Sequence, residues 1–368
     1  MNVCLFGSYS KNSYGIPSGN GGTLLKKILE GEKINVTECH YEVKGFLWLI
    51  TAYFSLFFKH FKIQYDVMII PWRGILTLPL AKLIHKGPII YFPAFSIYDT
   101  LVNDRKSVKH NSIKARLIHY VDKWACNVSD LIILESSEEI EYFKKEFNIQ
   151  SSKFRQCPLG ADESLFTPTT NRTNKDQFVV LYFGSFIPLH GVNSIVESAK
   201  NLQEYKKIIF RLCGDGQTRK EIEEFVSKNS LKNVEILGRV STKKLLDEIH
   251  QSDICLGIFG GTWKARKVVT NKVLQILACK KPLITMSSPA IIESHLIDKK
   301  NCILVQPDSP IAISQAILEL ERNSELRELI AEKGYQTYKK YLSMAKVGEI
   351  LANSINDLLM SQSKIISR

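Results

Sequence analysis

The chain has 368 residues, of which 45% are hydrophobic and 23% are charged. These values are typical of a folded soluble protein and exclude a chain too polar to build a core; at this length two domains are expected. The formal net charge of +12 favours an anionic partner: a phosphorylated substrate, an anionic lipid surface or nucleic acid.

The cysteines indicate a reduced protein. There are eight, none spaced as C-x-x-C and most inside apolar runs, so we expect buried free thiols and a cytoplasmic location, with peripheral association on the inner face of the cell membrane as a second option. Residues Met1–Gly7 have no basic segment and no long apolar core, and they predict a buried strand instead of a signal peptide.

Short apolar runs alternate with helical stretches along the whole chain, which predicts parallel sheets with crossover helices. In the first half the expected strands are Val3–Phe6, Val67–Ile70, Ile89–Phe92 and Leu131–Leu134. In the second half they are Val179–Phe183, Ile208–Cys213, Val234–Leu237, Ile254–Ile258, Leu283–Thr285 and Ile303–Val305.

A polar segment at Thr167–Lys175 separates the two series of strands and is the expected linker. We therefore expect an N-terminal domain over residues 1–168 and a C-terminal domain over residues 176–342. Residues 343–368 would form a last helix that crosses back to the first domain.

The segment Phe46–Phe61 is almost entirely apolar apart from Lys59 and His60. It is too short to span a bilayer, which needs about 20 residues. Two interpretations remain open: a helix buried in the first domain, or an interfacial helix whose aromatic face enters lipid beside basic residues.

Glycine-bearing loops before helices can bring backbone amides close to a phosphate. One such loop is Ser18–Thr23, and a second is Tyr182–Val192, which contains Ser185 and His190. A third, Phe259–Gln275, has four cations within nine residues around the start of a helix, where they suit a diphosphate; a solvated charged face is the alternative. In Ser287–Glu293 we expect Glu293 on a first helical turn, either as a capping acid or as a ligand for sugar hydroxyls.

In their order along the chain, several of these phrases resemble the retaining glycosyltransferases of the fourth sequence family, particularly those that assemble surface glycans in archaea and bacteria. The resemblance is carried by SIYDT at Ser96–Thr100, CPLGADESLF at Cys157–Phe166, YFGSFIPLHGV, LCGDG at Leu212–Gly216, LGRV at Leu237–Val240, NKVLQILACKKPLIT and NCILV at Asn301–Val305. It implies an α/β chain of GT-B architecture, with two facing Rossmann-like domains and a cleft between them.

The resemblance also implies roles for individual residues. The donor-binding set would be Gly184, Ser185, His190, Gly191, Gly214, Val240, Lys264, Lys267, Asn271, Lys272, Gln275 and Glu293. Gly21, Gly22 and Asp99 would bind the acceptor, and Gly22, Asp99, His190 and Lys267 would act in catalysis.

Five positions depart from the pattern of that family. Ser185 and His190 replace an arginine and a lysine, and Lys267 and Gln275 replace two glutamates. Pro93 stands where the family tends to place a histidine, and Asp99 is the nearest polar candidate. An amide at position 275 can still bind ribose hydroxyls, whereas lysine at 267 leaves the donor sugar undefined.

The implied activity is transfer of a hexose-type sugar, with retention, from a nucleoside diphosphate sugar to a glycan or a polyprenyl-linked acceptor. The sugar nucleotide would be a co-substrate. No cofactor or metal is expected, since the sequence has no D-x-D and no cluster with metal-ligand spacing. An epimerase of the same architecture and a non-catalytic sugar-nucleotide-binding protein are the alternatives. A nucleic-acid binder finds no support in the motifs.

Overall fold

The structure is a computed structural model that describes residues 1–7, 22–41, 48–169 and 176–366. The chain divides into two compact units, and each is described by itself. Of the described residues, unit 1 contains those up to Gly160 and those from Met344 onward, and unit 2 contains Ala161–Ser343. The expected boundary at residue 168 lies inside unit 2, and most of the expected linker, residues 170–175, lies outside the described residues.

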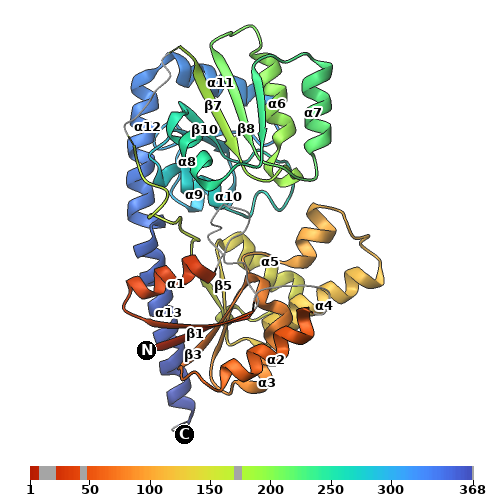
Figure 1. The fold of residues 1–368 in the computed structure, drawn as a ribbon, viewed down its shortest axis with the longest axis vertical. Coiled ribbons are helices and arrows are strands. Elements are labelled where there is room, and N and C mark those ends of the chain that lie inside the picture. Colours follow the sequence, from red (N-terminus) through yellow and green to blue (C-terminus); the bar gives the residue numbers. More distant parts are fainter. Residues whose placement is uncertain (8–21, 42–47, 170–175, 367–368) are drawn as a thin grey trace. The chain divides into compact units, whose positions relative to one another are not determined.

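Unit 1 alternates strands and helices (Figure 1). Its strands are β1 (Asn2–Gly7), β2 (Asn35–His40), β3 (Val67–Pro71), β4 (Ile89–Phe92), β5 (Leu131–Leu134) and β6 (Phe154–Gln156). Its α-helices are α1 (Gly22–Gly31), α2 (Trp48–His60), α3 (Leu78–Ile84), α4 (Ile113–Val128), α5 (Ser137–Phe147) and α13 (Met344–Ile366). A 3-10 turn, η1 (Trp72–Thr77), follows β3, a π-helical turn, η2 (Asp99–Asp104), follows β4, and the 3-10 turn η3 (Ser151–Lys153) precedes β6.

Unit 2 repeats this alternation. Its strands are β7 (Phe178–Phe183), β8 (Ile208–Cys213), β9 (Val234–Gly238), β10 (Ile254–Leu256), β11 (Leu283–Met286) and β12 (Ile303–Val305). Its α-helices are α6 (Val192–Asn201), α7 (Arg219–Lys228), α8 (Thr242–Gln251), α9 (Asn271–Ala278), α10 (Pro289–Glu293), α11 (Pro310–Arg322) and α12 (Ser324–Thr337). Its turns are η4 (Pro188–His190), a 3-10 turn, and η5 (Tyr338–Leu342), a π-helical turn.

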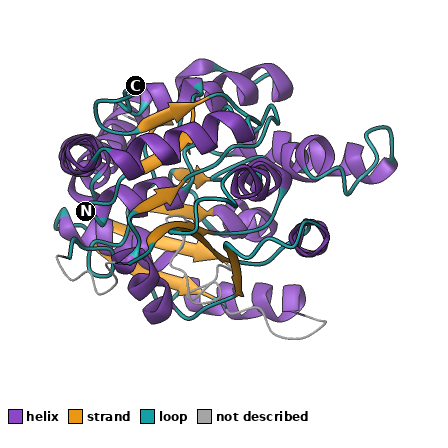
Figure 2. Ribbon diagram, turned by 90° about the horizontal axis from the view of Figure 1, so that it is seen from above, coloured by secondary structure: helices purple, strands orange, loops and turns teal. Residues whose placement is uncertain are grey.

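Both units contain a six-stranded sheet, with order β2-β1-β3-β4-β5-β6 in unit 1 and β12-β11-β10-β7-β8-β9 in unit 2. All the pairings are parallel, and helices enclose the strands (Figure 2). This agrees with the α/β fold class predicted from the alternating runs. The strand order reverses direction at the first strand of each unit, between β1 and β3 and between β7 and β10, which are the points where such sheets bind ligands.

The inner strands are buried because helices cover both faces of a parallel sheet. Every residue of β7 is buried. Val180 and Tyr182 of this strand belong to a core cluster that also contains Ile195 of α6 and Ile317 of α11. The alternating residues between them face the other side of the sheet.

The end of the chain returns to unit 1. Asn323 separates α11 from α12, and Ser343 separates η5 from α13. Helix α13 then packs against α1 and buries Val347, Leu351 and Ile355, which recur at helical spacing on one face. Among the described residues, no helix is long and apolar enough to cross a bilayer. All eight cysteines are free and buried, as the sequence predicts.

Candidate functional site

The strand-reversal point of unit 2 is built with very little free space. Gly184 follows β7 with φ of +138°, and a Cβ added there would lie 2.8 Å from both Cε and Nζ of Lys272. Gly214 follows β8 with φ of +159°, and a Cβ there would collide with the Gly184 carbonyl oxygen. Both positions therefore require glycine, because any side chain would be strained and would displace a neighbour.

Lys272 lies in the first turn of α9 and points under this glycine turn. Its side chain is buried, with 4% exposure for the residue. Nζ donates a hydrogen bond of 3.2 Å to the Tyr182 hydroxyl and lies 4.3 Å from the centroid of the Tyr182 ring. A strand residue thus fixes where the lysine ammonium lies.

Lys272 has no carboxylate partner among the described residues. Burial therefore destabilises its charged form and holds the pKa of Lys272 well below its ordinary value. A bound anion would reverse this effect, since it would supply the missing opposite charge in a place that water does not reach.

The N-terminus of α9 adds to this preference for anions. Thr270 is the N-cap residue, but its side chain makes no capping hydrogen bond. The Thr270 Oγ1 and Asn271 Oδ1 atoms are buried, and no described residue bonds to them. The first backbone amides of any helix lack intrahelical acceptors, and the helix dipole favours negative charge beside them.

His190 holds the loop that follows β7. Its Nδ1 lies 2.5 Å from the Ser185 carbonyl oxygen and 3.0 Å from the Tyr182 hydroxyl, and that hydroxyl itself donates to the Ser185 carbonyl at 2.8 Å. His190 is 9% exposed, whereas Ser185 is exposed. The imidazole therefore fixes the turn that places Ser185 at the surface.

The loop after β10 presses against the loop after β7. Gly191 has φ of +63°, and a Cβ there would lie 2.6 Å from the Gly260 backbone nitrogen. The Phe259 amide donates to the His190 carbonyl at 3.1 Å. This close backbone approach joins the two loops that flank the strand-reversal point.

The cations after β10 are mostly buried. Lys264 and Lys267 are 5% and 1% exposed, so a solvated charged face is the wrong interpretation for them and for Lys272. Arg266 is exposed and lies 5.4 Å from the ring centroid of Trp263. Gln275 of α9 is also buried.

Two expected donor residues follow other strands. Val240 is half-buried in the loop after β9. Glu293 is half-buried and is the last residue of α10; the expectation that it occupies a first turn is wrong. Ser288 is the N-cap instead, and its side chain accepts from the Ile291 amide, because a serine directly before Pro289 suits a helix start.

The residues expected on the acceptor side belong to unit 1. Gly22 is buried at the start of α1, and Gly21 lies outside the described residues. Asp99 is buried in η2, where its Oδ1 accepts from Asn103 Nδ2 at 3.0 Å and its amide donates to Ser96 Oγ at 3.0 Å.

Asp122 of α4 holds the segment that carries Asp99. Its Oδ2 accepts from Ser96 Oγ at 2.7 Å and from the Tyr98 amide at 2.9 Å. Burial raises the pKa of Asp122 to about 6, against the lowering effect of these hydrogen bonds. Among the described residues no group of His, Cys, Asp or Glu side chains is arranged to hold a metal ion.

Sequence reasoning missed Tyr182 and Asp122. Tyr182 lies inside an apolar strand, so the pattern predicts a core residue and nothing more. A tyrosine hydroxyl that is buried needs a hydrogen-bond partner, and this need could have indicated a polar contact at the site. Asp122 had a similar signal, because it is the single acid of the helix Ile113–Val128, and a carboxylate that is buried needs partners.

Comparison with known families gives a match to most of unit 2. Residues 166–337, somewhat less than half of the chain, match the family described as glycosyl transferases group 1. The matched segment includes every expected donor residue from Gly184 to Glu293.

Two curated relatives come from Methanocaldococcus jannaschii, and both are described as uncharacterized glycosyltransferases. One is 29% identical over 66% of this chain and 63% of its own length, so the match spans less than two thirds of that relative. The other is 22% identical over 80% of this chain and 76% of its own length.

Solved structures show that the fold is that of GT-B glycosyltransferases. Sucrose-phosphate synthase from Thermosynechococcus elongatus superposes with a TM-score of 0.77, at 14% identity, over 98% of this chain and 99% of its own. Anabaena HepE in complex with UDP superposes with a TM-score of 0.69, also at 14% identity, over 97% of this chain and 100% of its own.

Proposed function

We propose that the protein transfers a hexose-type sugar from a nucleoside diphosphate sugar to a glycan or polyprenyl-linked acceptor, with retention of the anomeric configuration. The segment that resembles group 1 glycosyl transferases, residues 166–337, would supply the donor site. The observation that carries the proposal is Lys272, a buried ammonium group at the strand-reversal point, beside the N-terminus of α9, to which no carboxylate of the described residues is paired.

A diphosphate is the anion that suits this place best. It brings two or three negative charges and many acceptor oxygens, and it is small enough to approach the glycine turns at Gly184 and Gly214. Anabaena HepE, which shares the fold, has been solved with UDP and with UDP-glucose, and this supports a uridine nucleotide and a hexose as the first donor to test.

The reaction breaks the bond between the anomeric carbon and the diphosphate oxygen, and the electron pair leaves with the diphosphate. Lys272 and the α9 amides stabilise that charge as it develops, which is usually the largest contribution to such catalysis. The acceptor hydroxyl attacks from the face that the diphosphate leaves. Its proton passes to a phosphate oxygen, so that no protein nucleophile is required.

The other expected residues receive roles in this scheme. Lys264, Asn271 and Gln275 would hold the nucleotide, and Lys267 and Glu293 would contact the sugar. His190 would act by fixing the Ser185 turn, since its Nδ1 already contacts the Ser185 carbonyl and the Tyr182 hydroxyl. In unit 1, Gly22 and Asp99 would bind the acceptor.

A panel of nucleoside diphosphate sugars, added one at a time in thermal melts, tests the donor. We expect one sugar nucleotide, and its nucleoside diphosphate, to raise the melting temperature because a ligand that binds only the folded state stabilises it. A chain that no sugar nucleotide stabilises would refute the proposal.

A second assay separates transfer from the two alternatives. The stabilising donor is incubated with polyprenyl-phosphate or oligosaccharide acceptors, and NMR reports the anomeric configuration of the product. Retained configuration is expected. Binding without turnover would favour the non-catalytic sugar-nucleotide-binding protein, and a changed sugar on an intact nucleotide would favour the epimerase.

A further inference from the structure

Helix α2 of unit 1 exposes a row of aromatic side chains. Of the side chains described between Leu49 and His60, only Ala52 and Leu56 are fully buried, whereas Phe54, Phe58 and the adjoining Phe61 are 65%, 63% and 68% exposed. The interpretation that these rings fill the core of the first domain is therefore wrong for Phe54, Phe58 and Phe61. The α2 surface is defined here as Ile50, Phe54, Phe57, Phe58 and Phe61, which recur at the spacing of one helix face.

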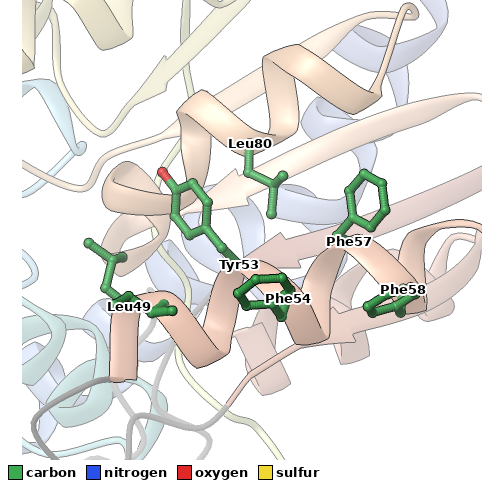
Figure 3. Close-up of a pocket in the computed structure, with 7 residues that line it drawn as sticks. Leu49, Tyr53, Phe54, Phe57, Phe58 and Leu80 are labelled. Carbon is green, nitrogen blue, oxygen red and sulfur yellow. The ribbon is translucent and has the colours of Figure 1, made fainter.

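A hollow of about 700 Å³ opens on this surface between α2 and α3. Leu80 points from α3 toward α2, between the rings of Tyr53 and Phe57 (Figure 3). The Tyr53 hydroxyl donates to the Leu76 carbonyl at 2.9 Å and so ties α2 to η1, the turn directly before α3. The hollow is lined almost entirely by hydrocarbon and has room for a single lipid chain.

Basic side chains lie at one end of the surface. Lys59 and Lys62 are exposed at the end of α2, and Lys82 and Lys86 are exposed at the end of α3. These two ends are held together by three rings, because Tyr65 contacts His60 with centroids 5.7 Å apart and His85 with centroids 4.8 Å apart. The aromatic row therefore ends in a group of exposed lysines.

Acidic residues are almost absent from this part of the chain. Residues 43–98 contain six lysines and arginines but a single acid, Asp66. That carboxylate accepts from the Asn2 amide at 2.7 Å. A second copy of the chain would bring the same cations against these cations, so electrostatic repulsion disfavours self-association through this surface.

We propose that the α2 surface docks on an anionic lipid bilayer. The phenylalanines would enter the boundary between headgroups and acyl chains, one lipid chain would occupy the hollow, and the four lysines would meet the headgroup phosphates. An exposed apolar patch with a cationic edge, in a stretch of chain with a single acid, matches the chemistry of such a bilayer. The inference does not depend on the proposed transfer reaction.

Co-sedimentation of the full chain with vesicles tests the docking. Wild type is mixed with vesicles of phosphatidylglycerol and phosphatidylcholine, or of phosphatidylcholine alone, at rising sodium chloride. We expect stronger binding to the anionic vesicles and a loss of that preference with salt, because salt screens exposed charges. A folded wild type that ignores anionic vesicles at low salt overturns the proposal.

Substitutions locate the surface. Phe54→Glu and Phe57→Glu should each weaken vesicle partitioning by about tenfold or more, because they place a carboxylate among lipid chains and anionic headgroups. Leu329→Glu is the matched control, since Leu329 is an exposed leucine of α12 in unit 2. It should bind vesicles as wild type does.

Melting curves and UDP titrations of the same variants show whether they remain folded. If Phe54→Glu or Phe57→Glu does not fold, Phe58→Ser is used in its place. Any of these variants that is folded and still partitions onto vesicles as wild type does overturns the proposal. If wild type does not bind vesicles but forms a dimer that Phe54→Glu abolishes, the α2 surface mediates self-association. That result would also overturn the docking proposal. Unchanged UDP affinity in a variant released from vesicles keeps this test separate from that of the transfer reaction.

Discussion

The two units have the same type of parallel sheet, but they differ in the position of the residues that are unfavourable for a folded protein in water. Unit 2 arranges its strands in the order 3-2-1-4-5-6, counted from β7, whereas unit 1 begins 2-1-3-4-5, counted from β1. Both are doubly wound orders with a strand-reversal point beside the first strand. Unit 2 buries a lone ammonium group at that point, and unit 1 exposes aromatic rings on an outer helix.

Each of these features opposes the stability of the isolated chain. A buried cation with no opposite charge beside it among the described residues, and a row of exposed phenylalanines, are both unfavourable in water. Such unfavourable features are expected at sites where a bound ligand or a contacting surface compensates for their cost in free energy. The comparison teaches that the interior of unit 2 is suited to an anion and the outside of unit 1 to an apolar phase.

Alanine at Gly214 should give the largest effect on folding. The positive φ and the collision with the Gly184 carbonyl are expected to destabilise the protein by about 3 kcal/mol or more in denaturant unfolding. The control in unit 1 is Gly31→Ala, where nothing lies within 4 Å of the added Cβ. It should be neutral or stabilising by up to about 1 kcal/mol. Equal effects at the two positions would contradict the account of the tight turn.

Replacing Lys272 should weaken ligand binding without weakening the fold. Lys272→Met is expected to reduce the affinity for UDP by about 1–3 kcal/mol, because a charge-assisted hydrogen bond is lost, and Lys272→Ala should weaken it in the same range. Thermal stability should stay the same or rise in Lys272→Met, because the uncompensated buried cation is removed.

Calorimetric titration and melting curves check both effects. Lys220→Met serves as the control, since the Lys220 side chain is 88% exposed on α7. It should leave both quantities unchanged. A variant at Lys272 with the dissociation constant of wild type would show that the diphosphate lies elsewhere.

The pH dependence of stability and of UDP affinity should reflect Lys272 of unit 2. Burial lowers the pKa of Lys272 from its ordinary value of 10.5 in the folded, unliganded protein. Between the lowered pKa and 10.5 the unfolded chain binds the extra proton, so stability without ligand rises with pH through this window, by at most about 1.4 kcal/mol per pH unit. UDP prefers the charged lysine, and its affinity should fall as pH rises through the lowered pKa.

Titrations of UDP across pH check this linkage, with Lys272→Met as the comparison. The methionine variant should lose the part of the pH dependence that belongs to Lys272. Vesicle binding through unit 1 should show no corresponding change in that variant. A wild type and a methionine variant with identical pH profiles would contradict the role of the lysine.

Removing one hydroxyl should give the smallest effect. Tyr182→Phe deletes the oxygen that accepts from Lys272 but keeps the ring beside the ammonium group. We expect UDP affinity to fall by about 0.5–1.5 kcal/mol. Tyr53→Phe in unit 1 removes a single hydrogen bond of similar kind, to Leu76, and should leave UDP affinity unchanged. Equal losses in both variants would point to a general effect on stability.

The sequence predicted the inner strands well because they are short, fully buried apolar runs, as in β7 and β5. It missed β2 and β6, which lie at the two edges of the unit 1 sheet. Their residues are partly exposed and polar, as in Asn35–His40. Edge strands pair through backbone groups on one side only, so they leave no continuous hydrophobic signal.

The candidate site was predictable in part. Lys272 could be proposed as a phosphate ligand because cations precede a helix at that point of the chain. Its burial beneath Gly184, and its contact with Tyr182, depend on residues about ninety positions away in the sequence. A local pattern cannot indicate that a lysine is buried; only the packing of α9 against the loop after β7 decides it.

The measurement that tests the central claim most directly is a crystal structure of the protein with UDP. We expect a diphosphate oxygen within about 3 Å of Lys272 Nζ, beside the Gly184 turn and the first amides of α9. A diphosphate bound elsewhere, with Lys272 still held only by Tyr182, would contradict the account.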